Sequence, residues 1–241
     1  MDEPRLLRIY PLADRYLADD HKTPKWRIIS AEVARTSSDP RPESYKIQPL
    51  SIRAEGHLDT ADGWAERRRI LLRDEFLVGG IEDIERRQEL TGQSLGIVKP
   101  VSIEDVIVRR VSRSDLEERR TRYEEIFRQQ ELWPPGEAPV PPRQFDVRVR
   151  FRGPEDSRVY DRVILDWEVY ALAGNLRAKG GILEDNLRDA LLRGAFDPAK
   201  KDVHLMLGNI SSHPQEFVVV AIFYPPIPKP PEPERQVGMF G

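Results

Sequence analysis

Three carboxylates in the second half of the chain could do metal chemistry: Asp161, Asp166 and Glu168. A cluster of acidic side chains can hold Mg²⁺, and the ion can activate water for phosphodiester hydrolysis, as in nucleases. The usual nuclease pattern adds a lysine two residues after the acid, but position 170 is tyrosine. Asp166 equally suits the residue before a helix, where a carboxylate caps free main-chain N–H groups. These three residues are therefore only weak candidates for a catalytic centre.

A row of arginines could bind phosphate groups. Residues 145–152 read Phe-Asp-Val-Arg-Val-Arg-Phe-Arg, and this alternation is typical of a half-buried strand. Arg148, Arg150 and Arg152 would then share one face at intervals of about 7 Å, close to the phosphate spacing of a nucleic acid strand. Four more residues would widen this patch or place a basic side chain beside an aromatic ring: Arg143, Arg158, Lys25 and Arg41. A solvated outer face in an arginine-rich protein explains the same pattern.

Other residue types offer little for a metal or a cofactor. The chain has no cysteine, which excludes disulfides and cysteine-based chemistry. His204 and His213 would face each other if the last two strands form a hairpin, but a third ligand is not evident. We expect no metal and no cofactor, and we favour a binding function over an enzymatic one.

The C-terminal segment has the character of a docking peptide. Residues 225–234 are rich in proline, and favour an extended polyproline II conformation. Gln236, Val237, Met239 and Phe240 follow, where only a partner can bury the apolar side chains. They resemble the peptide with which bacterial DNA-processing proteins dock on the replicative sliding clamp, the beta subunit of DNA polymerase III. The resemblance implies that Gln236 hydrogen-bonds at a pocket rim and that the three apolar residues fill the pocket. Valine and methionine replace the two leucines usual in that peptide. Packing of this segment on its own domain, or recognition by another module, remains open.

The body resembles an uncharacterised family of prokaryotic proteins. The resemblance rests on Arg41-Pro42-Glu43-Ser44-Tyr45, Ser94-Leu95-Gly96-Ile97, Leu165-Asp166-Trp167-Glu168 and Phe223-Tyr224-Pro225-Pro226. Relatives in that family carry a Cys/His cluster just before the Asp-Trp-Glu position. Residues 153–161 contain neither residue type here, so the resemblance implies no metal site, and it assigns no activity.

The pattern of strands and helices expected along the sequence predicts an α+β fold. The first half alternates short apolar strands with connectors and then adds helices, which favours a small β-barrel-like half with appended helices. The second half reads ββααββ. Residues 217–223 are continuously apolar, so we expect a central strand that is buried on both faces.

Prolines suggest how the chain is divided. We expect an N-terminal β-rich domain with helices over residues 1–133 and a stiff proline-rich linker over 134–143. A mixed sheet with two helices would occupy residues 144–224, and residues 225–241 would form the extended tail.

Composition restricts the class of protein. A net charge of −3 over 241 residues argues against a strongly basic nucleic-acid binder, although it allows a local basic patch. No apolar run is long enough to span a bilayer, so we expect no membrane contact and a cytoplasmic location. Abundant proline and scarce asparagine favour a thermophilic source.

These features together predict a DNA repair or replication accessory protein. It would bind nucleic acid or a protein partner and dock on the sliding clamp through its last residues. The first alternative is a metal-dependent nuclease or other nucleic-acid-processing enzyme. The second is a protein-binding subunit of a defence or mobile-element complex.

Overall fold

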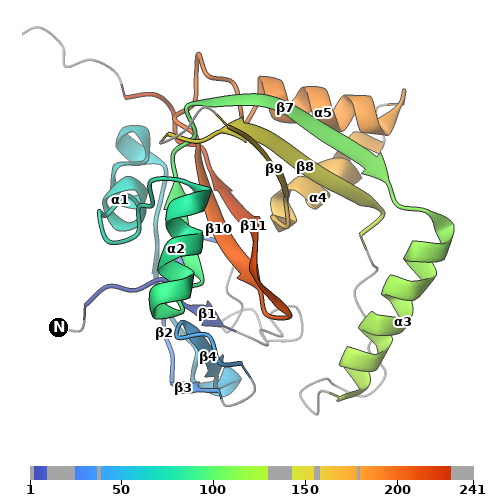
Figure 1. The fold of residues 1–241 in the computed structure, drawn as a ribbon. Coiled ribbons are helices and arrows are strands. Elements are labelled where there is room, and N and C mark those ends of the chain that lie inside the picture. The colour runs from blue at the N-terminus through green and yellow to red at the C-terminus, as the bar shows by residue number, and fades with distance from the viewer. Residues whose placement is uncertain are drawn as a thin grey trace, which may run out of the picture.

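The computed structural model of the protein describes residues 3–9, 25–36, 39–129, 143–154, 158–177 and 180–228. The fold is α+β, as predicted, with helices and strands mixed along the chain (Figure 1). Within these ranges no helix is both long enough and apolar enough to cross a membrane.

An antiparallel sheet of three strands carries the predicted arginine row. Its central strand is β8 (Phe145–Arg152), which lies between β7 (Ser102–Arg110) and β9 (Val159–Val163). The apolar residues of β8 are at most 3% exposed and face the hydrophobic core. Because side chains alternate along a strand, the arginines project from the opposite face.

A second antiparallel sheet has the order β11 (His213–Phe223), β10 (His204–Ile210) and β6 (Leu95–Val98). The two sheets meet at one parallel bridge between Ile164 and Val219, where the Leu165 N–H donates to the Val219 carbonyl at 2.7 Å. β11 is therefore first in its sheet, not central as predicted. Residues 217–219, 222 and 223 of β11 are nevertheless buried, whereas residues 213–216 are exposed.

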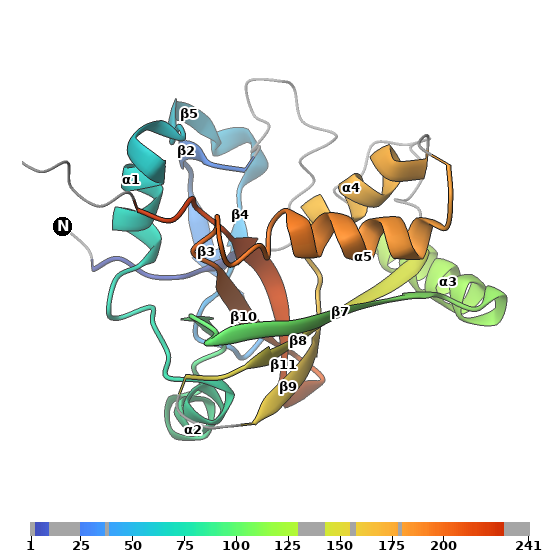
Figure 2. The same cartoon turned by 90° about the horizontal axis from the view of Figure 1, so that it is seen from above.

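Helices complete the core on the inner face of the β7–β8–β9 sheet. α4 (Trp167–Leu176) and α5 (Leu183–Arg193) contribute buried residues at one end, and α2 (Ile81–Thr91) contributes Ile81 and Ile84. α3 (Arg113–Gln129) projects away from the body (Figures 1 and 2). Arg119 of α3 binds Asp146 near the start of β8, and the rest of the outer face of that strand carries the arginine row.

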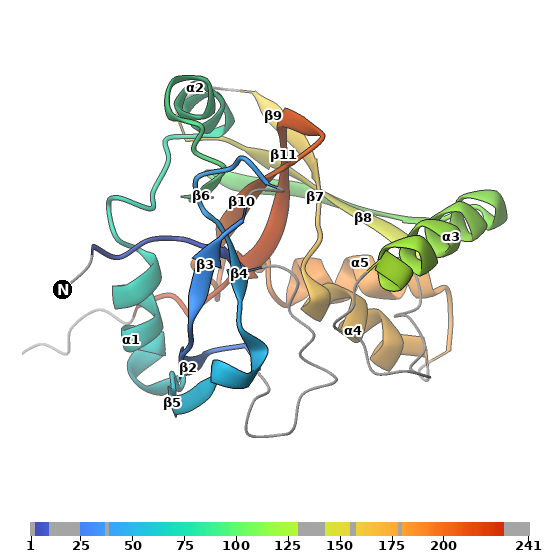
Figure 3. The same ribbon diagram turned by 90° about the horizontal axis from the view of Figure 1, so that it is seen from below.

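The N-terminal strands form two small sheets. One has the order β1 (Arg8–Ile9), β4 (Ser44–Ile47), β3 (Val33–Arg35), and the other pairs β2 (Arg27–Ser30) with β5 (Arg53–His57). A short 3₁₀ turn, η2 (Pro49–Ser51), precedes β5, and α1 (Ala61–Leu71) follows it. Among the described residues these strands do not close into a barrel. Figures 2 and 3 show this N-terminal unit on one side of β10 and β11, with β7–β9 on the other.

The described residues do not pack as two separate units on either side of the predicted linker. Of residues 134–143, only Arg143 is described. β7 precedes this segment and β8 follows it, yet the two strands pair along their length. The hydrophobic core likewise draws on residues from Val78 to Ile222. Elements after the segment follow the order β8, β9, α4, α5, β10, β11.

Candidate functional site: a cleft between two strand edges

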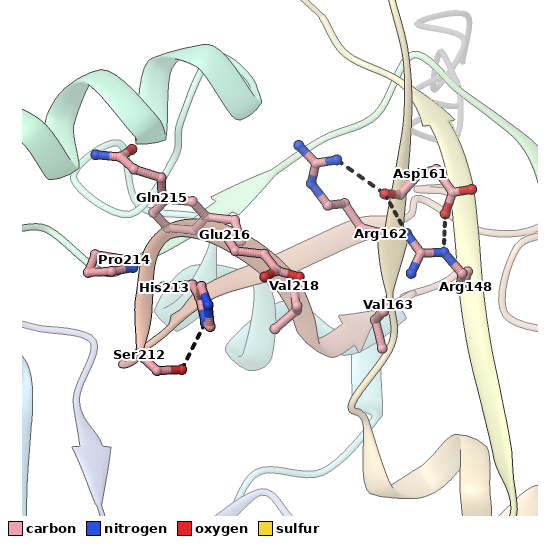
Figure 4. A pocket seen from close by; sticks show the side chains of 11 residues that line it. Arg148, Asp161, Arg162, Val163, Ser212, His213, Pro214, Gln215, Glu216 and Val218 are labelled. Carbon is pink, nitrogen blue, oxygen red and sulfur yellow. Dashed lines mark hydrogen bonds and ion pairs between the residues drawn. The ribbon is translucent and has the colours of Figure 1, made fainter. Parts of the chain in front are cut away.

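A cleft of about 620 Å³ opens where β9 and β11 separate. One wall is formed by Arg148 on β8 and by residues 161–163 on β9. The other wall is the start of β11, from His213 to Val218 (Figure 4). Among the described residues β9 and β11 pair only next to the Ile164–Val219 bridge, and the cleft lies between the two strands beside this bridge.

Two guanidinium groups cover a main-chain carbonyl on the β9 wall. Arg148 Nη2 and Arg162 Nη1 each donate to the main-chain oxygen of Asp161 at 3.1 Å. The Nε of Arg148 also binds the Asp161 carboxylate. The cleft thus has guanidinium donors on the β9 side, together with the carboxylates of Asp161 and Glu216.

The β11 wall carries a hydroxyl beside an imidazole. The Ser212 hydroxyl lies 2.9 Å from His213 Nδ1. In the described part of the chain no carboxylate contacts that imidazole, whereas a serine nucleophile usually needs a base that a third group orients. This arrangement favours ligand binding over acyl transfer.

The structure brings the three arginines of β8 together on one face, next to the cleft. Arg148 and Arg152 are half-buried, and Arg150 is exposed. Arg152 Nε lies 3.4 Å from Glu104, whose pKa is lowered chiefly by a hydrogen bond from the Ser102 hydroxyl, with Arg152 adding to the effect. Nearby carboxylates thus offset part of the positive charge of the row.

The other four predicted nucleic-acid contacts have partners within the protein, and Arg158 lies next to the arginine row because Val159 pairs with Arg152. Arg158 pairs with Glu82, and the guanidinium carbon of Arg143 lies 5.4 Å from the centre of the Tyr170 ring. Lys25 pairs with Glu168 on α4 at 2.7 Å. Arg41 pairs with Asp39 and contributes to the contact between the N-terminal unit and the body, as described below. Each of these four residues thus contacts another side chain of the protein.

The three candidate catalytic carboxylates do not form one cluster. Asp161 lies in the cleft beside Arg148. Asp166 caps α4, accepting from the Glu168 N–H at 3.0 Å, and also accepts from the Ile222 N–H at 2.8 Å. Glu168 and Asp166 line a separate cavity of about 370 Å³ between α4, α5 and β11. No group of three or more His, Cys, Asp or Glu side chains able to hold a metal occurs in the described ranges.

The two histidines of the last hairpin lie far apart along it. β10 and β11 do form a hairpin, but its register sets His204 opposite Phe223 and His213 opposite Ile210. These pairs are at opposite ends of the ladder. Burial lowers the pKa of His204, whose Nδ1 contacts the Asp202 carbonyl.

Sequence reasoning missed a polar network between the N-terminal unit and the body. We call it the interface network, and it comprises Arg8, Asp39, Arg41, Glu43, Ser44, Ser94 and Asn209. Ser94 is fully buried, and Glu43 accepts hydrogen bonds from both its N–H and its hydroxyl at 2.8 Å. Arg8 Nη2 donates to the Ser94 carbonyl at 2.7 Å. Several of these residues lie in the sequence segments that carry the family resemblance. That resemblance was the feature of the sequence that could have indicated the network.

An aromatic cluster forms a second contact between the N-terminal unit and the body. The guanidinium carbon of Arg67 lies 4.3 Å from the ring centre of Trp26 and 4.9 Å from that of Trp64. Both indoles also pack on Phe223 at the end of β11. Trp26 therefore helps to join the two parts, and it stacks on an internal guanidinium group.

The predicted clamp-binding residues Gln236, Val237, Met239 and Phe240 lie outside the described residues. The described chain ends at residue 228, after the Ile227 N–H donates to the Lys200 carbonyl at 3.0 Å.

Comparisons with known proteins place the boundary between the two parts near residue 76. A domain of unknown function (DUF8758) matches residues 1–73, which correspond to the N-terminal unit. A second domain of unknown function (DUF8757) matches residues 79–240, which contain the cleft. No curated protein and no solved structure matches the chain. The match over residues 79–240 covers more than half of the sequence, and the chain therefore belongs to the DUF8757 family.

Proposed function

We propose that this protein is a cytoplasmic DNA-transaction accessory that contacts nucleic acid through β8 and docks on the replicative sliding clamp through residues 236–240. The observation that carries the proposal is the row of Arg148, Arg150 and Arg152 on the open face of β8, beside a cleft that offers further donors. The tail resemblance supplies the proposed partner.

The ion pairs within the row are compatible with phosphate binding. Arg148 and Arg152 are each about one-third exposed, and ion pairs at such positions are typically worth only about 0–1 kcal/mol. A phosphate can therefore replace Asp161 or Glu104 at small cost. Binding of about three phosphates gives a log–log salt slope of roughly −2 to −3, which also makes the predicted affinity strongly dependent on ionic strength.

Fluorescence anisotropy with labelled single-stranded and duplex DNA tests the nucleic-acid contact. Arg150→Glu should weaken binding by roughly tenfold or more and make the salt slope about one unit less steep. Arg193→Glu changes the charge equally on α5, at a side chain that is 83% exposed, and should leave binding unchanged. Equal affinities for the two variants would remove β8 from the proposal.

Clamp docking is tested separately with a peptide of residues 227–241 titrated against a bacterial sliding clamp. Gln236→Ala and Phe240→Ala should each weaken binding by roughly tenfold or more, because a few anchors carry most of the affinity of a short peptide. Glu232→Ala, in the proline-rich part, serves as the matched control. No binding, or equal binding by all variants, would refute clamp docking and leave the β8 experiment unaffected.

Protein binding is the second candidate function, and the cleft of about 620 Å³ between the two sheets favours it. The nuclease alternative has less support, because Asp161 lies in one cavity and Asp166 and Glu168 line another.

A further inference from the structure

We infer that the cavity between α4, α5 and β11 binds a small uncharged molecule with a mainly apolar surface and a carbonyl oxygen. The inference goes beyond the proposed function, since it requires neither DNA nor a clamp. It rests on the side chains that line this cavity, on which of their polar groups already have partners, and on the balance of their charges.

The walls of the cavity are mainly apolar. Four large apolar side chains from all three elements line it: Val169, Leu172, Leu191 and Ile222. Ala190 and Ala195 line it where α5 ends, and their small side chains leave the space open. The volume of about 370 Å³ falls in the range of about 300–1,000 Å³ that is typical of pockets for small molecules. Such pockets are likewise mostly apolar, with a few polar groups that orient the ligand.

The two carboxylates that line the cavity already have partners within the protein. One oxygen of Asp166 accepts from the Glu168 N–H, and the other accepts from the Ile222 N–H. Glu168 binds the Lys25 ammonium at 2.7 Å, and that ammonium also lies 3.5 Å from Asp166. A ligand therefore gains little by bringing a further donor to these two carboxylates.

Two donors that line the cavity lack such partners. Among the described residues, neither the Lys201 ammonium nor the Tyr224 hydroxyl forms a hydrogen bond or an ion pair, and the ammonium lies 5.6 Å from the centre of the Tyr224 ring. Burial raises the pKa of Tyr224, and the charges of Glu168 and Asp166 add to the rise, so the hydroxyl remains protonated at neutral pH. A carbonyl oxygen has two lone pairs and can accept from both donors.

The charges around the cavity favour an uncharged ligand. Two negative charges, on Asp166 and Glu168, stand against two positive charges, on Lys25 and Lys201. A carboxylate placed at Lys201 would share the cavity with Asp166 and Glu168, whereas a cation would compete with Lys25 for Glu168. A carbonyl group accepts a charge-assisted hydrogen bond from Lys201 without adding a charge.

NMR of the labelled full-length protein tests this inference with four probes of similar size that differ at one group. Acetophenone carries the carbonyl, and isopropylbenzene replaces its oxygen with a methyl group. The 1-phenylethylammonium ion carries a positive charge, and benzoate carries a negative one. Acetophenone should shift the signals of residues that line the cavity, and should bind more tightly than either charged probe.

Three substitutions establish where and how the probes bind. Lys201→Met removes the ammonium but keeps an unbranched side chain and the hydrogen bond from the main-chain N–H to Asp197. Ala190→Leu fills part of the cavity and retains a residue that favours helix. Lys200→Met is the matched control, because the Lys200 side chain is 71% exposed, pairs with Asp197 and does not line the cavity. The spectrum of each unliganded variant shows whether it is folded.

We expect Lys201→Met to weaken acetophenone binding by roughly tenfold or more and to leave isopropylbenzene binding unchanged, since only the ketone accepts a hydrogen bond. Ala190→Leu should weaken the binding of both probes, and Lys200→Met should change neither. The inference would be overturned if acetophenone failed to shift the cavity signals or bound less tightly than a charged probe. An equal effect of Lys201→Met on the ketone and the hydrocarbon would overturn it as well.

Discussion

Removing the carboxylate of Glu43 should weaken the attachment of the N-terminal unit to the body. In the structure this carboxylate accepts two hydrogen bonds of 2.8 Å from Ser94, which is fully buried. It also supports the positive charge of Arg8, whose pKa falls to about 10, mainly through burial and then through Arg41, while Glu43 opposes the fall. Glu43→Ala therefore leaves the two buried donors of Ser94 without their acceptor and removes a negative charge that acts on Arg8.

The magnitude follows from those contacts. Hydrogen bonds to a charged group contribute about 1.5–3 kcal/mol each. Because Glu43 accepts two of them from Ser94, we expect Glu43→Ala to lower the free energy of unfolding by about 3–6 kcal/mol. With a urea m-value of about 2–3 kcal/mol/M, the midpoint should fall by roughly 1–3 M.

Urea unfolding is followed by circular dichroism for the whole chain and by tryptophan fluorescence, to which Trp26 and Trp64 in the aromatic cluster contribute. Glu55→Ala is the control, because Glu55 binds only the exposed Ser30 hydroxyl in the described structure, at 2.6 Å, and its loss should cost less than about 1 kcal/mol. A loss for Glu43→Ala no larger than that of the control would show that the interface network does not stabilise the fold.

Three further predictions concern single positions. A hydrogen bond from Arg41 holds the pKa of the Asp39 carboxyl well below its usual range. The ionised carboxylate therefore stabilises the fold fully above about pH 4, and this contribution is lost as the pH falls further. Urea midpoints measured between about pH 5 and 2 should fall less steeply in Asp39→Asn than in the wild type. Asp166→Ala removes the cap of α4 and the acceptor of a β11 N–H, and should cost about 2–4 kcal/mol by urea unfolding. Gly96→Ala would set a Cβ 2.7 Å from Val78 Cγ1 in the core, and should cost about 1–3 kcal/mol in the same assay, whereas an unchanged midpoint would show that the core relaxes freely.

Local pattern was enough to predict the strand that carries the arginine row. The alternation of residues 145–152 placed its apolar side chains in the core, because one face of β8 is buried and the other is open. The helix cap at Asp166 could likewise be predicted from the sequence, since capping depends only on neighbouring residues.

Contacts between segments that are distant in the sequence could not be predicted from the local pattern. Arg8 and Ser94 are 86 residues apart, and Arg41 and Asn209 are 168 apart, so nothing in their local sequences marks them as neighbours. β11 was predicted to be central because its composition reports burial on both faces. Burial can come from other packed elements as well as from flanking strands. Here Trp26 and Trp64 of the N-terminal unit cover Phe223, while Phe217, Val219 and Ile222 belong to the hydrophobic core of the body.

The two proposed binding regions lie toward opposite ends of β11, which bears on how they would act together. The cleft uses the start of the strand, from His213 to Val218, whereas the chain leaves β11 after Phe223 and is held by Arg68, which donates to the Pro226 carbonyl at 2.6 Å. At about 3.3 Å per residue, Gln215 and Phe223 are separated by roughly 26 Å. The described start of the proline-rich segment therefore lies well away from the cleft, so a ligand bound in the cleft would not contact residues 225–228.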